Sequence, residues 1–294
     1  MRYFIYLQYD GTNYHGWQTQ PDCVSVQETI EQKLSLLLRR ELFIVGAGRT
    51  DAGVHARLMV AHFDYEPDDN SPSSLVHRQP STVHCEPCTM NSEPCTVNPE
   101  PCTVNCQQLA FKLNGILPPD IAILRIVPVR DEAHARFSAL SRTYRYYVTA
   151  QKSPFDPLYT MHTYREYDVP LMNEAASHLF DYIDFTSFAK LHTDVKTNNC
   201  RIMQAHWDVV PQQFIAPGRG AGDVLVFTVQ ADRFLRNMVR AIVGTLLLVG
   251  RHKLTVEQFC RTIELKDRCQ AGDSVPASGL FLEDVEYPES IYID

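Results

Sequence analysis

The chain has 294 residues, of which 45% are hydrophobic and 21% charged, a composition typical of a folded globular protein with about two domains. Its most apolar window, Ala241–Gly250, is far shorter than the roughly 20 residues that span a bilayer, and no apolar targeting segment is evident, so a membrane protein is not expected. The formal net charge of −8 disfavours a protein whose whole surface binds nucleic acid, but it leaves room for a local basic site.

The first half of the chain predicts elements in the order β-α-β-β-α-β. Four runs rich in apolar and β-forming residues predict strands, at residues 3–9, 42–45, 58–64 and 121–129. A helix is expected after Ser25, which forms a capping-box pattern with Glu28 and precedes apolar residues at helical spacing. A second helix is expected over 109–117, ending before Pro118.

Residues 79–106 hold four tandem heptapeptides with a proline every seven residues and few large apolar side chains. This composition predicts an irregular insertion rather than a module with its own core. Zinc binding is the alternative, because Cys85 and Cys88 form a C-x-x-C pair and Cys102 and Cys106 add a second pair. The second pair is one residue too wide for the P-C-x-x-C pattern of zinc deaminases, and the repeat itself explains the spacing. We therefore expect no metal, and nine cysteines without a secretory context indicate a reduced, cytoplasmic protein.

The second half repeats the same order loosely. Apolar runs predict strands at residues 141–150, 200–210, 224–231 and 280–287. Helices are expected from Pro170, over 234–249, and from Thr255. We therefore expect an α+β fold of two ferredoxin-like domains, residues 1–140 and 141–294, in which helices pack on antiparallel sheets and a catalytic cleft lies between the domains.

The segment Gly48–Ala56, with the sequence GRTDAGVHA, places Asp51 in a glycine-rich loop. Glycines allow a backbone to approach a ligand closely. The loop is not a dinucleotide fingerprint, because Asp51 occupies the third glycine position, and it is not a phosphate loop, because Val54 occupies the lysine position. An aspartate in such a loop can also simply bond its own turn, so a function for Asp51 needs support from other residues.

GRTDAGVHA resembles the signature loop of the TruA family of tRNA pseudouridine synthases. The resemblance extends over almost the whole chain in seven ordered blocks, which are Tyr14–Gln18, Gly48–Ala56, Leu113–Ile121, Ala135–Tyr146, Phe185–Lys190, Phe234–Arg240 and Gly279–Pro288. One such block would have little specificity, whereas seven in the same order are very specific. Residues 79–106 match no block, which marks them as an insertion.

The resemblance implies isomerisation of uridine to pseudouridine at positions 38, 39 and 40 in the anticodon stem-loop of tRNA, without a cofactor, by a homodimer whose basic cleft binds the tRNA. Matched to the family's motifs, Asp51 is the nucleophile and Arg240 pairs with it. Tyr144 packs on the target base, and Leu280 lines the base pocket.

The residue types suit this chemistry. A carboxylate such as that of Asp51 can act as a nucleophile toward carbon, and a neighbouring arginine favours its ionised form. An aromatic ring such as that of Tyr144 can replace the stacking that an extruded base loses. Further basic side chains are candidate phosphate contacts, namely Arg49, Arg136, Arg142, Lys190 and Lys196. The spacing of Arg233, Arg236 and Arg240 predicts one basic stripe on a helix.

Two other hypotheses stay open from the sequence alone. A protein of this fold could bind RNA without chemistry, although pure binding does not require the combination of Asp51, Tyr144 and Arg240. The cysteine repeats could instead form a zinc module. His55, in the same loop as Asp51, is expected to orient that loop rather than to transfer a proton.

Overall fold

The computed structural model describes residues 1–67, 71–72, 74–77, 103–150, 159–190, 197–211 and 223–293. Its α-helices are α1 (Val26–Leu38), α2 (Cys106–Ile116), α3 (Val169–Ser177), α4 (Met238–Gly250) and α5 (Val256–Glu264). The first-half strands are β1 (Arg2–Tyr9), β2 (Val45–Gly46), β3 (His55–Asp64), β4 (Val76–His77), β5 (Thr103–Val104) and β6 (Ile121–Val129). The second-half strands are β7 (Ser141–Thr149), β8 (Met161–His162), β9 (Ile202–Pro211), β10 (Asp223–Ala231) and β11 (Leu280–Glu286).

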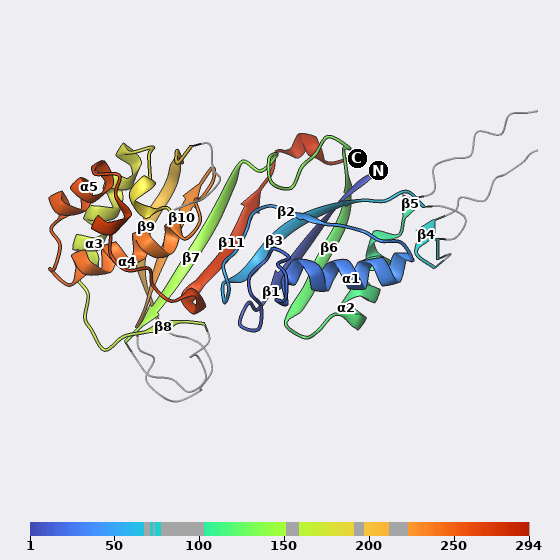
Figure 1. Cartoon of the computed structure of the whole chain (residues 1–294), viewed down its shortest axis with the longest axis horizontal. Coiled ribbons are helices and arrows are strands. Elements are labelled where there is room, and N and C mark those ends of the chain that lie inside the picture. The colour runs from blue at the N-terminus through green and yellow to red at the C-terminus, as the bar shows by residue number, and fades with distance from the viewer. Residues whose placement is uncertain are drawn as a thin grey trace, which may run out of the picture.

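One continuous sheet runs along the molecule in the order β6-β1-β3-β11-β7-β10-β9, with β2 paired to β3 and β8 paired to β7 (Figure 1). Most pairs are antiparallel, whereas β11 is parallel to β3 and β8 is parallel to β7. The sequence predicted separate sheets for the two halves. That prediction is wrong in this respect, because β11 pairs with β7 on one side and with β3 on the other.

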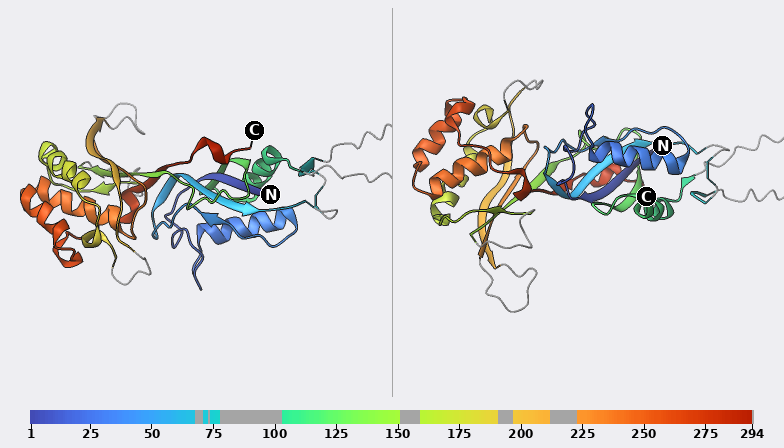
Figure 2. Two further views of the ribbon diagram at one scale, coloured as in Figure 1. Left: turned by 90° about the horizontal axis from the view of Figure 1, so that it is seen from above. Right: turned by 60° about the horizontal axis from the view of Figure 1, so that its bottom comes forward.

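The molecule is elongated along the direction in which the strands follow one another (Figure 2). Helices α1 and α2 lie with the N-terminal strands at one end, and α3, α4 and α5 gather at the other end (Figure 1). The strands at the middle of the sheet, β3, β11 and β7, therefore come from both halves of the chain.

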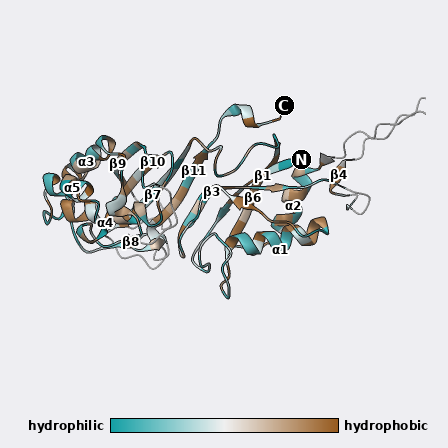
Figure 3. Ribbon diagram, turned by 45° about the horizontal axis from the view of Figure 1, so that its top comes forward, coloured by the Kyte–Doolittle hydropathy of each residue, from teal (hydrophilic) through white to brown (hydrophobic). Residues whose placement is uncertain are grey.

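Local sequence explains most of the elements. Ser25 caps α1 by accepting a hydrogen bond from Glu28 N, as predicted, and Thr255 and Gln258 form the predicted capping box of α5. Polar and apolar residues are interspersed along α1 (Figure 3), and the buried ones recur every four residues, as expected of a helix with one buried face. In contrast, α4, which contains the apolar window Ala241–Gly250, is buried along nearly its whole length.

The strand predicted over 42–45 is reduced to Val45 and Gly46. In the residues just before Val45, backbone amides bond to side chains of α1 instead of to a neighbouring strand. The amide of Leu42 donates to Ser35 Oγ at 2.9 Å, and the amide of Ile44 donates to Glu31 Oε1 at 2.8 Å. A segment whose amides bond to a helix in this way cannot also extend the sheet ladder.

The helix predicted over 234–249 begins only at Met238. Asn237 has a φ of 66°, in the left-handed region, so the residues before it cannot continue the helix. Arg233 and Arg236 precede α4, and the prediction of one helical stripe with Arg240 is therefore wrong.

The end of the predicted insertion belongs to the fold. Thr103 and Val104 pair with β4, Val104 is buried, and Asn105 caps α2 by accepting from Gln108 N at 2.9 Å. The prediction of irregular structure is thus wrong for residues 103–106. Residues 79–102, which include Cys85, Cys88 and Cys102 of the zinc hypothesis, lie outside the described residues.

Within the described ranges, no helix is long and apolar enough to cross a membrane. The buried apolar side chains form one cluster that reaches from α1 and β1 to α4 and α5.

Candidate active site

The Asp51 loop connects β2 to β3 and is held against the segment that follows β1. The amide of Trp17 donates to the Thr50 carbonyl at 3.2 Å, and the hydroxyls of Thr50 and Tyr9 are 2.8 Å apart. Gly16 has a φ of 96°, and a Cβ there would lie 2.4 Å from the Thr50 oxygen, so only glycine allows this approach. These contacts fix the backbone that presents Asp51.

The carboxylate of Asp51 lies between two guanidinium groups. Arg236 Nε is 3.5 Å from Oδ1, and Arg240 Nη1 is 3.6 Å from Oδ2. Two cations beside one carboxylate compensate its negative charge and restrict its orientation. Arg240 therefore lies beside Asp51 as expected. Arg236 is a second partner of Asp51, whereas the sequence analysis named it only as part of a basic stripe.

The two arginines differ in how firmly they are held. Arg240 Nε donates to the Val275 carbonyl at 2.7 Å, and the amide of Val275 donates to the Arg240 carbonyl at 3.2 Å. The Arg240 side chain is 21% exposed, whereas that of Arg236 is 56% exposed. Arg240 is therefore a fixed neighbour of Asp51, and Arg236 lies at the solvent side of the site.

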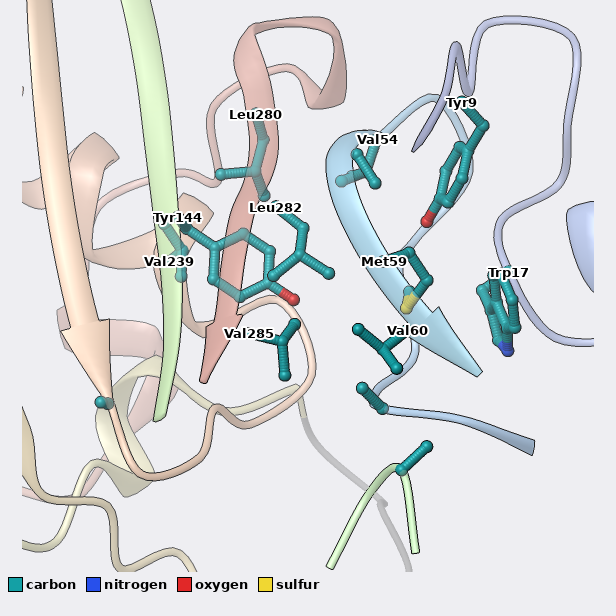
Figure 4. Packing of buried hydrophobic residues seen from close by; sticks show 14 of the residues in the cluster. Tyr9, Trp17, Val54, Met59, Val60, Tyr144, Val239, Leu280, Leu282 and Val285 are labelled. Atoms are coloured by element: carbon teal, nitrogen blue, oxygen red, sulfur yellow. The ribbon is translucent and has the colours of Figure 1, made fainter. Parts of the chain in front are cut away.

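Tyr144 lies on β7 with its ring directed toward β11 and β3, beside Leu280 and Leu282 (Figure 4). Leu282 is its register partner, and the ring of Phe234 packs edge-on at 5.0 Å. Burial, together with a smaller contribution from the negative charge of Asp51 and against the opposing charge of Arg142, raises the pKa of Tyr144 to about 12. The phenol is thus neutral at physiological pH, and the ring lies close enough to Asp51 to respond to its charge.

Leu280 is the first residue of β11 and is buried, next to Leu282 in Figure 4. His55 is also buried, with its ring stacked on Phe281 at 4.6 Å and its Nδ1 3.1 Å from the amide of Gly11. His55 therefore contacts both β11 and the segment after β1, a location that suits the expected role of orienting the loop.

Of the remaining candidate phosphate contacts, Arg49, Arg136 and Lys190 are exposed. The amide of Lys190 donates to the Arg236 carbonyl at 3.0 Å, so Lys190 lies at the same edge of the site as Arg236. Lys196 lies outside the described residues.

Arg142 has a different environment from that expected. It is buried, and its two terminal nitrogens donate to the carbonyls of Ala139 at 3.2 Å, Asp232 at 2.7 Å, Ala47 at 3.0 Å and Arg136. Burial also lowers the pKa of Arg142. A guanidinium enclosed by protein carbonyls has little surface for an RNA phosphate, so Arg142 joins segments of the protein instead.

No group of three or more histidine, cysteine, aspartate or glutamate side chains in the described part of the chain could hold a metal ion. The groups that the structure brings together at the candidate site are the carboxylate of Asp51, its two arginines, and the buried side chains of Tyr144 and Leu280.

Comparison with known proteins places the chain that carries this site in one class of enzyme, the tRNA pseudouridine synthases. A family profile described as tRNA pseudouridine synthase matches residues 175–288. Proteins named tRNA pseudouridine synthase A match over nearly the whole chain. The one from Bacteroides thetaiotaomicron is 52% identical over 291 residues, which cover 99% of this chain and 92% of its own. The one from Colwellia psychrerythraea is 32% identical over 297 residues, which cover 99% of this chain and 95% of its own. The chain belongs to the tRNA pseudouridine synthase A (TruA) family, as the sequence motifs indicated.

Proposed function

We propose that this protein isomerises uridines at positions 38, 39 and 40 in the anticodon stem-loop of tRNA to pseudouridine, with Asp51 as the nucleophile. Its family is one of isomerases named for action on tRNA. The observation that carries the mechanistic part is the Asp51 carboxylate between Arg236 and Arg240, next to the buried ring of Tyr144.

The reaction breaks the bond between the sugar C1′ and the base N1 and forms a bond between C1′ and C5, while the proton on C5 is lost to solvent. One fragment must be held while the base turns. The ionised carboxylate of Asp51 can bond to carbon and be displaced again when the new bond forms, which requires no redox cofactor.

The neighbours of Asp51 supply the conditions for this step. Arg240 holds the carboxylate in one orientation, because its own guanidinium is fixed by the carbonyl of Val275. Tyr144 and Leu280 offer an apolar surface for the extruded uracil, and stacking on an aromatic ring contributes about 1–3 kcal/mol per base. The neutral phenol of Tyr144 adds no charge that would compete with Asp51.

Exposed basic side chains around the site support binding of an RNA backbone. We assign this role to Arg49, Arg136, Lys190 and Arg236, and Lys196 stays a candidate from its residue type alone. Arg142 is left out because its donors bond to protein carbonyls.

We also propose that residues 1–140 and 141–294 are two ferredoxin-like units with the active site between them. The repeated pairing order supports this division. In the first half the sheet runs β6-β1-β3-β2, and in the second half β11-β7-β10-β9. With the two-residue strands β4, β5 and β8 set aside, each half thus places its four strands in the order fourth, first, third, second. A homodimer in the cytoplasm, where tRNA is found, completes the proposal by resemblance to the family.

Substitution of Asp51 by asparagine tests the proposal. D51N is expected to abolish pseudouridine formation in unmodified tRNA, because an amide is not an effective nucleophile toward carbon. The assay is release of tritium from 5-labelled uridine in tRNA. E283Q is the matched control, since Glu283 also lies between two arginines, Arg57 at 3.8 Å and Arg145 at 3.3 Å. E283Q should retain activity, and a D51N variant that still released tritium would exclude Asp51 as the nucleophile.

The same assay addresses the alternative that the protein binds RNA without chemistry. Wild-type protein that bound tRNA and released no tritium would support that alternative. Release that depends on Asp51 excludes it.

A further inference from the structure

Phe137 is a large apolar side chain that the fold leaves in solvent, with 76% of its surface exposed. It lies in the loop of residues 133–139, between β6 and β7, next to the exposed Arg136. The Arg136 guanidinium lies 5.6 Å from the centre of the Phe137 ring, and the ring of His134 lies 4.5 Å away on the protein side. An aromatic face beside a cation is the combination that nucleobases and phosphates recognise.

The backbone of this loop is held from several directions, unlike that of a mobile surface turn. His62, a buried residue of β3, accepts a hydrogen bond from the amide of Ala135 at 3.2 Å. The hydroxyl of Tyr287 donates to the Ala135 carbonyl at 2.5 Å. Within the loop, the amide of Ser138 donates to the His134 carbonyl and the amide of His134 donates to Ser138 Oγ, both at 2.9 Å. The loop thus presents Phe137 on a fixed backbone, which lowers the entropic cost of binding a ligand there.

Arg142 connects the loop to the active site. One of its nitrogens donates both to the Arg136 carbonyl and to the Ala47 carbonyl, and Ala47 lies four residues before Asp51. Its other terminal nitrogen donates to the Asp232 carbonyl, four residues before Arg236. Arg142 and Tyr144 lie on the same face of β7, about 7 Å apart along the strand. The Arg136 carbonyl, which is bonded to the Arg142 side chain, therefore lies on the same side of β7 as Tyr144.

We propose that Phe137, supported by Arg136, is a stacking platform for an unpaired base next to the target uridine in the RNA substrate. The ring stacks on the base, and the Arg136 guanidinium contacts the adjoining phosphate. Stacking on an aromatic ring tolerates any base, so the platform suits an enzyme that acts at neighbouring positions of one stem-loop. The proposal rests on the RNA substrate proposed above and adds a binding residue outside the Asp51 pocket.

Truncation of Phe137 provides the test, and the chain supplies a matched control. Phe111, on α2, is also 76% exposed, so F111A and F137A remove equal side chains from equally exposed sites. We expect F137A to weaken binding of an unmodified tRNA transcript about tenfold, in line with the loss of one base–aromatic contact, and F111A to leave it unchanged. F137W should bind as well as wild type, whereas F137L, which keeps apolar surface without a ring, should resemble F137A.

A spectroscopic readout locates the contact directly. The two native tryptophans, Trp17 and Trp207, are buried, so the fluorescence of an added exposed tryptophan is separable from theirs. Fluorescence of F137W should be quenched when tRNA binds, beyond any change in wild type or in F111W.

Equal tRNA affinity of F137A and F111A, or equal quenching in F137W and F111W, would overturn the platform. These binding measurements do not depend on turnover. Wild-type protein that binds tRNA but forms no pseudouridine would refute the proposed function and leave the platform standing.

Discussion

Arg236 and Arg240 lie at similar distances from Asp51, but their surroundings assign them different tasks. Arg240 is fixed by the backbone of Val275 and is mostly enclosed. Arg236 precedes α4 and is exposed over more than half of its side chain. An enclosed cation acts on the carboxylate more strongly than an exposed one, because solvent screens the exposed charge.

This difference predicts different kinetics for R240Q and R236Q. R240Q should lower kcat about 100-fold, the usual cost of removing one preorganised electrostatic partner, with little change in KM. R236Q should lower kcat/KM less than tenfold, mainly through KM, since an exposed guanidinium can leave Asp51 for an RNA phosphate. Single-turnover rates over a range of tRNA concentrations separate the two effects. Equal losses of kcat in both variants would contradict the assignment.

Asp51, Tyr144, Leu280 and Arg240 could be proposed from the sequence because each lies in a motif block of the family. Arg236 lies in the same block, but its pairing depends on the backbone at Asn237, whose left-handed conformation ends the helical spacing. Arg142 shows the opposite case. An arginine in a motif suggests a phosphate contact, and only the folded backbone shows that its donors are already used by protein carbonyls.

Among the elements, the loop of residues 133–139 depends on a histidine that is neutral in the fold. Burial, followed by the positive charges of Arg2 and His134, lowers the pKa of His62 to about 4. Its Nδ1 accepts a hydrogen bond from the amide of Ala135, which requires that nitrogen to be unprotonated. Protonation of His62 would therefore remove one of the contacts that fix the loop.

A pH dependence of stability follows. The unfolded chain binds the His62 proton near pH 6.5 and the folded chain only near pH 4, so acid favours unfolding across this window. The free energy of unfolding of wild type should fall by about 2–3 kcal/mol relative to H62N between pH 7 and pH 4. Urea unfolding at several pH values measures this difference. H252N serves as the control, because the His252 imidazole is exposed. A difference in unfolding free energy between wild type and H62N that stayed constant with pH would contradict the prediction.

The start of α4 and the end of the repeat segment show why element boundaries escaped the sequence. Apolar periodicity continues from Phe234 into α4, but the left-handed Asn237 interrupts the helix without changing the hydrophobic pattern. Val104 lies in a repeat unit that looks irregular, yet it pairs with β4 and enters the core. In both cases a tertiary contact or a single backbone angle overrides the local pattern.

At the scale of the whole molecule, the order of elements was predictable and their joining was not. Strand and helix order follows from local runs along the chain. The parallel contact between β11 and β3 covers only Phe281 with His55 and Leu282 with Ala56, residues more than 200 positions apart. No local pattern indicates such a pairing, although it places the Asp51 loop and Leu280 beside each other. The candidate active site therefore depends on the least predictable feature of the sheet.

The chain as a whole is acidic, whereas its proposed substrate is a polyanion. Binding then requires local neutralisation of phosphates by the basic side chains around Asp51, and each such contact releases counterions.

Arg57 is a close match to Arg236: they are 54% and 56% exposed, and both face a carboxylate, at 3.8 Å and 3.5 Å. Arg57 packs on Phe281 and Tyr147, whereas Tyr144 and Leu280 lie on the other face of their strands. R236Q should therefore make the slope of log K for tRNA against log salt shallower by about 0.7–0.9, and R57Q should leave it unchanged. Equal slopes for the two variants would mean that the RNA does not follow the face that carries Asp51.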